Sequence, residues 1–100
     1  MTSANTQQVN KNAVFAQITQ EMAEIYAAKN HDYGNSFSES MEEFGLISAA
    51  VRMNDKMKRI KSFSKMCPEA MQVKNESIQD TLLDLANYAV MTLVELRCKT

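Results

Sequence analysis

Residues that break helices or cross-link chains are scarce in this sequence. Its 100 residues include two Gly, one Pro, two Cys and no Trp, and aromatic residues make up 7%. Because Gly and Pro mark most tight turns, their scarcity indicates few turns and few strands. We therefore expect an all-α fold. A chain this short is expected to form one domain and to leave much of its surface exposed, so we also expect that oligomerisation completes the fold.

The sequence also lacks the marks of export and of membrane insertion. Cys67 and Cys98 form no CxxC motif and have no His at zinc-ligand spacing, which is typical of reduced thiols in the cytoplasm. Residues 1–12 are polar and contain no apolar segment of a secretory signal. No apolar run approaches the roughly 20 residues of a membrane span. We therefore expect a cytoplasmic protein of a bacterium or a phage-infected host, with no membrane partner.

Neither positive nor negative charge is in large excess. Eleven Lys and Arg residues oppose twelve Asp and Glu residues, for a formal net charge of −1. A general nucleic-acid binder needs a surplus of bases that neutralises phosphates. We therefore expect no general nucleic-acid binding, although this balance is compatible with a locally charged pocket for a small ligand.

Helix formers dominate what is present, and apolar residues recur at three- and four-residue spacing in three segments. In the first of them, Val14, Ile18, Met22 and Ile25 follow this pattern. The spacing predicts three long amphipathic helices. The predicted elements are a frayed polar tail at 1–12, long helices over about 13–29, 46–66 and 76–96, and a short helical turn at about 38–44.

Turn residues separate these helices. Asn, Asp, Gly and Ser residues fill most of the segment 30–36, and their side chains favour turns over helix. Gly45 is expected to end the short helical turn, and Pro68 ends the second long helix because it disfavours helical geometry in the residue before it. No connection reads as a flexible linker, so we predict a single all-α domain over 13–100.

An acidic stripe on the third long helix points most directly to chemistry. Glu76, Asp80 and Asp84 are spaced by four and Asn87 follows three residues later, so their side chains fall within roughly a quarter of the helix circumference. Neighbouring carboxylates repel one another, and a hard cation such as Mg²⁺ removes that repulsion. We predict that the three acids bind Mg²⁺. The alternative is a solvated acidic face near a helix N-terminus, where acids are also favourable.

A basic stripe lies on the second long helix. Arg52, Lys56 and Arg59 stand at i, i+4 and i+7, hence on one side of the helix. One interpretation is a phosphate clamp, in which Arg offers a planar fork and Lys a point charge. The other is a set of interhelical salt bridges to Asp80 or Asp84. The two are compatible, because some cations can position carboxylates while others bind phosphate.

The segment 29–37, KNHDYGNSF, combines several residue types that suit a nucleotide. Tyr33 is suited to stacking on a base, and Asn35 to a hydrogen bond with a base edge or a phosphate. The alternative is a plain helix stop and turn, which needs Asn, Asp and Gly in any case. The predicted nucleotide-binding residues are Lys29, Asp32, Tyr33, Asn35 and Asn87.

Two pairs of acids have ExxE spacing. They are Glu21 with Glu24 and Glu39 with Glu42. Such pairs are frequent by chance on helices, so each indicates little by itself. The sequence contains no Ser/His/Asp set and no Gly-rich phosphate loop.

The chain contains KNHDYGNSF at 29–37, RMNDKMKRI at 52–60 and ESIQDTLLDLANYAVM at 76–91. Together these segments resemble the phage and bacterial family called nucleotide modification associated domain 1, over about residues 13–97. More distantly, the chain resembles the all-α nucleoside triphosphate pyrophosphohydrolases of the MazG-like and dimeric dUTPase-like group. That resemblance implies a helical bundle, usually a dimer or a higher homo-oligomer. It also implies ExxE and ExxD motifs on facing helices that hold Mg²⁺, and hydrolysis to a monophosphate and pyrophosphate.

This resemblance assigns roles to particular acids. Asp84, in DLANY, takes the Asp position of the ExxD motif, and Thr81 stands where its Glu would be. The ExxE partner is either the Glu21 pair or the Glu39 pair, and we take Glu21, Glu24 and Asp84 as the catalytic set. The expected activity is Mg²⁺-dependent cleavage of a (deoxy)nucleoside triphosphate, including a modified phage nucleotide. The competing hypothesis is a non-catalytic helical module that binds a nucleotide or a protein.

Overall fold

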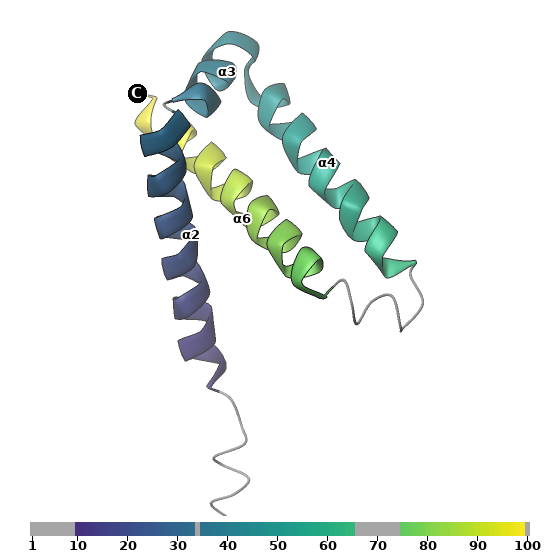
Figure 1. Cartoon of the computed structure of the whole chain (residues 1–100). Helices are drawn as coiled ribbons and strands as arrows, with labels where there is room; N and C mark the ends of the chain where they lie inside the picture. Colours follow the sequence, from purple (N-terminus) through teal and green to yellow (C-terminus); the bar gives the residue numbers. More distant parts are fainter. Residues whose placement is uncertain (1–9, 34, 66–74, 100) are drawn as a thin grey trace, which may run out of the picture. The chain divides into compact units, whose positions relative to one another are not determined.

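The computed structural model describes residues 10–33, 35–65 and 75–99, and within these ranges every regular element is a helix (Figure 1). The prediction of an all-α fold with three long helices and a shorter helical element is confirmed. No helix in these ranges is long and apolar enough to cross a membrane. The helices are α2 (Lys11–Tyr33), α3 (Ser36–Phe44), α4 (Leu46–Ser64) and α6 (Asn75–Cys98).

Helix α2 is longer at both ends than the sequence pattern predicts. It begins at Lys11, because the side chain of Asn10 accepts a hydrogen bond from the Ala13 backbone N–H at 3.2 Å and so caps the helix. It ends at Tyr33, four residues after the predicted end, since the weak turn preference of Asn and Asp does not outweigh continued intrahelical bonding. Residues 1–9 of the predicted tail lie outside the described residues.

The chain divides into two compact units, residues 1–32 and 33–100. Most of α2 belongs to the first unit, and most of its described side chains are exposed. Its predicted apolar stripe is exposed at Val14 and Ile18 and half-buried at Met22 and Ile25. The prediction of one domain over 13–100 stays a prediction.

The second unit has a small core where α4 packs against α6 and α3 packs against α4. The Phe37 ring of α3 stacks on the Tyr88 ring of α6, with centroids 6.0 Å apart and planes 23° from parallel. Phe63 is buried near the end of α4. The rest of the core consists of buried Met41 and Ala49, with half-buried Met53 and Met91 packed against them.

Gly45 makes the sharp turn between α3 and α4 that is visible in Figure 1. Its φ of 77° lies in the left-handed region, which other residues rarely adopt. Its N–H donates to the Met41 carbonyl at 2.8 Å and closes the last turn of α3. The predicted end of the short helix at Gly45 is therefore correct, and α4 begins at the next residue.

Candidate functional site

Arg52 of α4 contacts residues of both α3 and α6. Its guanidinium carbon is 5.1 Å from the Phe37 ring centroid and 6.0 Å from the Tyr88 centroid, and one of its nitrogens donates to the Ser40 hydroxyl at 3.3 Å. Each cation–π contact contributes about 0.5–2 kcal/mol, depending on how far it is desolvated. Arg52 therefore ties α3, α4 and α6 together, and its role in binding phosphate stays a prediction.

The same three residues unite the three sequence segments singled out above. Phe37 ends KNHDYGNSF, Arg52 begins RMNDKMKRI and Tyr88 belongs to DLANY. Neither Phe37 nor Tyr88 is among the residues predicted for the site. The available signal was their place inside the segments that carry the family resemblance.

Lys56 and Asp84 form an ion pair between α4 and α6. The lysine Nζ lies 3.1 Å from an oxygen of the carboxylate, and the side chains are 20% and 35% exposed. Such a partly solvated pair contributes on the order of 1 kcal/mol or less to stability. The salt-bridge interpretation thus holds for Lys56, and Asp84 rather than Asp80 is its partner.

The acidic stripe of α6 runs from solvent into the protein. Asp80 is exposed, Asp84 is half-buried and Asn87 is only 7% exposed. The side-chain Nδ2 of Asn87 is buried and has no hydrogen-bond partner among the described residues. An unpaired buried donor costs about 1–3 kcal/mol, so this position favours an acceptor oxygen. The side chain of Glu76, the first acid of the stripe, lies outside the described part.

Thr81 is buried at the position to which the resemblance assigns the Glu of an ExxD motif. Its side chain is 2% exposed, and its hydroxyl donates to the Ser77 carbonyl at 2.8 Å. A Glu at this position would bury its carboxylate, which is costly without a partner. Asp80 and Asp84, the acids next to it along the helix, instead occupy positions that reach solvent.

The Glu39 and Glu42 pair lies on α3, and Glu42 lies beside the C-terminal end of α6. Both side chains are exposed on α3, and Glu42 lines a cavity of about 190 Å³ together with Glu95 of α6. The Ser38 hydroxyl donates to Glu95 and fixes α3 beside this end of α6. Asp84 lies eleven residues before Glu95, about 16 Å along the helix.

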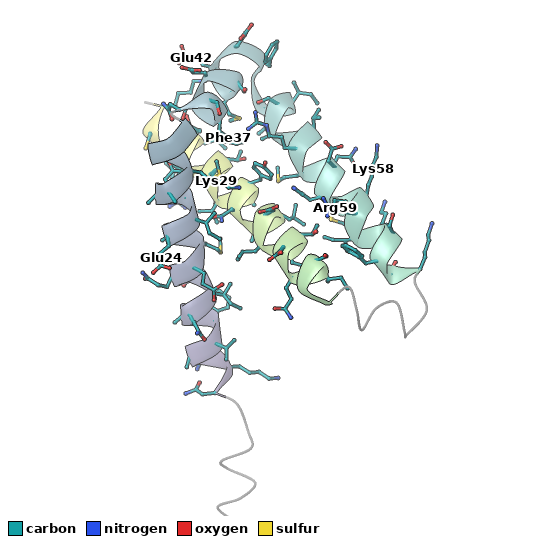
Figure 2. All side chains as sticks on the ribbon, in the orientation of Figure 1. Glu24, Lys29, Phe37, Glu42, Lys58 and Arg59 are labelled. Carbon is teal, nitrogen blue, oxygen red and sulfur yellow. The ribbon has the colours of Figure 1, made fainter. Side chains whose placement is uncertain are left out.

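The other candidate acids, Glu21 and Glu24, are exposed on α2, in the first unit. Figure 2 shows the Glu24 side chain on this helix. Four residues separate the pair from the start of the motif segment at Lys29, which is also exposed. The catalytic role predicted for Glu21 and Glu24 stays a prediction.

The segment 29–37 is part helix and part turn. Asp32 and Tyr33 lie in the last turn of α2, and their side chains lie outside the described part. Asn35 is exposed at the N-cap position of α3 and makes no side-chain capping bond. It borders a hollow of about 380 Å³ lined otherwise by Ser38 and three Glu residues, and this acidic rim suits a base amine better than a phosphate.

Arg59 completes the basic stripe. Its side chain is exposed, and Figure 2 shows it on the side of α4 toward α6, whereas Lys58 lies on the outer side. Within the described part of the chain, no three His, Cys, Asp or Glu side chains gather closely enough to hold a metal ion. The predicted ligand set of Glu76, Asp80 and Asp84 is not fully represented in that part.

Comparison with known proteins gives one match. No curated protein and no solved structure matches this chain. The model of the family called nucleotide modification associated domain 1 matches residues 29–96, a range that begins at KNHDYGNSF and includes all of α3 and α4 and most of α6. The chain therefore belongs to the nucleotide modification associated domain 1 family.

Proposed function

We propose that this protein is a Mg²⁺-dependent pyrophosphohydrolase for a (deoxy)nucleoside triphosphate, including a modified phage nucleotide. One observation carries the proposal: Asp84, which pairs with Lys56 of α4 at 3.1 Å, lies on the same side of α6 as Asn87, whose buried amide nitrogen has no hydrogen-bond partner among the described residues. A cation, a carboxylate and a free donor on one surface suit a ligand that combines phosphates with a metal ion. The name of the family, which refers to nucleotide modification, supports a nucleotide as that ligand.

The acids of α6 fit a hard cation. Asp80 and Asp84 lie one turn apart and both reach solvent, which suits an ion that takes a few carboxylate oxygens and keeps several waters. Together with Glu76 they would hold Mg²⁺, and the bound ion supplies neutralisation of phosphate charge. The remaining chemistry belongs to the protein's own side chains.

In this proposal different side chains contact the phosphates, the nucleoside and the attacking water. Lys56 moves its ammonium group from Asp84 to a phosphate oxygen, with Arg59 beside it, and Asn87 donates its free amide to a substrate oxygen. Fixed cations and donors of this kind stabilise developing charge in the transition state. Glu21 or Glu24 orients the attacking water. The nucleoside contacts fall to the segment residues Lys29, Asp32, Tyr33 and Asn35.

The active form in this proposal is a homodimer or a higher homo-oligomer with a MazG-like helical bundle. Large apolar side chains on α4 and α6 are exposed, including Val51, Leu82 and Leu93. A second copy would cover part of this surface and complete the bundle.

The test is pyrophosphate release across a panel of nucleoside triphosphates, with and without Mg²⁺. We expect turnover that requires Mg²⁺ and that falls by about 100-fold or more in Asp84→Asn, because the variant loses a charged group at the reacting phosphates. Asp55→Asn makes the same chemical change at an exposed position of α4 and serves as the matched control. Absence of turnover with every nucleotide, or equal turnover in both variants, would contradict the proposal.

The second candidate is a non-catalytic module that binds a nucleotide or a protein. The Lys56–Asp84 pair is also compatible with this candidate, because the ammonium group of Lys56 balances the charge of Asp84. Calorimetry separates the two candidates. Nucleotide binding of equal strength with and without Mg²⁺, and with no product formed, would support the module.

A further inference from the structure

The ion pair of Lys56 and Asp84 is held in place by the packing beside it. Lys56 lies one turn after Arg52 on α4, and Asp84 lies one turn before Tyr88 on α6. Arg52 packs on the Tyr88 ring, so the next turn of two antiparallel helices brings Lys56 opposite Asp84. The pair therefore follows from the register in which α4 and α6 pack, and is not a chance contact of two mobile side chains.

This pair places a fixed positive charge on the acid that the proposed function assigns to a metal ion. The Lys56 Nζ is 3.1 Å from a carboxylate oxygen of Asp84, and the two side chains are only 20% and 35% exposed. A divalent cation bound to the same carboxylate would lie close to the ammonium group. Two positive charges at that separation repel each other, the more so where water is partly excluded. Asp84 is therefore a poor metal ligand while Lys56 remains on it.

Two neighbouring side chains suit an anion that would draw Lys56 away. Arg59 is exposed three residues after Lys56, on the side of α4 toward α6 (Figure 2), so one anion can bind both cations. Asn87 lies on the same side of α6 as Asp84 and is 7% exposed. Its buried amide nitrogen has no hydrogen-bond partner among the described residues. This unpaired donor is independent of the ion pair, and it points to a ligand oxygen beside it.

An anion with several linked phosphates fits this exchange better than a single phosphate. When Lys56 moves to a phosphate oxygen, the carboxylate of Asp84 regains its charge for a cation, and the cation is attracted by the phosphates as well. Two or three linked phosphates have enough oxygens to share among Lys56, Arg59 and a cation that takes oxygen ligands. A single phosphate has fewer oxygens and less charge to share among the same partners.

We propose that Lys56 keeps divalent cations off Asp84 in the free protein and releases Asp84 only for a ligand with at least two linked phosphates. The inference rests on the proposed function, because it takes Asp84 as a metal ligand. It adds an order of binding, in which the phosphates open the metal site. Because coupling between two ligands is reciprocal, the cation strengthens binding of the linked phosphates by the same factor.

Metal binding to the full chain without nucleotide tests this control directly, with no need for turnover. The probe is Mn²⁺, which prefers the same oxygen ligands as Mg²⁺ and whose free concentration is measured by electron paramagnetic resonance. We expect Lys56→Met to bind Mn²⁺ about tenfold or more tightly than the wild type, since the competing cation is gone. A second uncharged variant, Lys56→Gln, should show a gain of the same sign, and circular dichroism verifies that the helices of each variant are intact.

Two further variants assign the gain to this ion pair. Lys58→Met removes the same charge from the outer side of α4 and is the matched control, so it should leave the affinity for Mn²⁺ almost unchanged. Adding Asp84→Asn to Lys56→Met should abolish the gain, because the released carboxylate is then absent.

Calorimetry of two inorganic anions tests the requirement for linked phosphates. Inorganic triphosphate should bind the wild type about tenfold or more tightly with Mg²⁺ than with metal removed by a chelator, whereas inorganic phosphate should gain little from Mg²⁺. The dependence on Mg²⁺ should be smaller in Lys56→Met, because Asp84 is then available to the cation before the anion binds.

Several results would overturn the proposal. They are equal Mn²⁺ affinity of the wild type and Lys56→Met, an equal gain in Lys58→Met, and a gain that persists when Asp84→Asn is added. Equal dependence on Mg²⁺ for phosphate and triphosphate would exclude the requirement for linked phosphates. These results are distinct from failure of the proposed hydrolysis. A Lys56→Met variant that gains Mn²⁺ affinity in a chain that cleaves no nucleotide would support the control by Lys56 and refute the hydrolysis.

Discussion

The two sides of α4 have similar residue types and different environments. The inner side contains Ala49, Arg52 and Lys56, which are respectively buried, stacked on two aromatic rings and paired with Asp84. The outer side contains Ile47 and Lys58, both exposed. Apolar and basic residues therefore occur on both sides, and only neighbouring helices make one side a core. Composition of a helix face does not by itself say whether the face is structural, functional or an interface.

The largest difference in stability between the two sides of α4 is expected for substitutions at two adjacent alanines. Ala49→Leu should lower the free energy of unfolding by about 1–3 kcal/mol, because added methyl groups overpack a fully buried position. Ala50→Leu makes the same change at an exposed position and should have almost no effect. Chemical denaturation at one fixed protein concentration measures both variants. Equal destabilisation by the two would mean that α4 is packed on both sides.

A smaller effect, of opposite sign, is expected at Asn87. Asn87→Leu removes an unpaired buried donor and should stabilise the free protein by about 1 kcal/mol. The same change should weaken nucleotide binding, because it removes the proposed donor. Asn54→Leu, at an exposed position on the outer side of α4, is the control. A lower stability of Asn87→Leu would show that the amide has a partner in the free protein.

The smallest effect concerns the ion pair. Lys56→Met should cost about 1 kcal/mol or less, and the cost should shrink at high salt because the pair is partly exposed. Lys61→Met, on the outer side, should lower the free energy of unfolding by less at any salt concentration.

Asp84→Ala tests whether the acidic stripe of α6 and the basic stripe of α4 serve only to hold the two helices together. In that case the variant will have a lower melting temperature and unchanged turnover. Thermal unfolding across a salt series, alongside the pyrophosphate assay, distinguishes the two roles.

Much of the candidate site was predictable because helical geometry is local. The spacing of Glu76, Asp80, Asp84 and Asn87 puts them on one side of α6 whatever surrounds the helix. The basic stripe of α4 follows by the same rule. The depth of each residue is not local, so the progression from exposed Asp80 to buried Asn87 required the packed helices.

The sequence by itself determined the helices, the turn at Gly45 and the grouping of charges into stripes. These features depend on periodicity and on backbone preferences, which act over a few residues. Only the tertiary structure decided that Lys56 pairs with Asp84, that Thr81 is buried and that Arg52 packs on Phe37 and Tyr88. The reason is that burial and pairing depend on which helix faces which, and residues far apart in the chain set that contact.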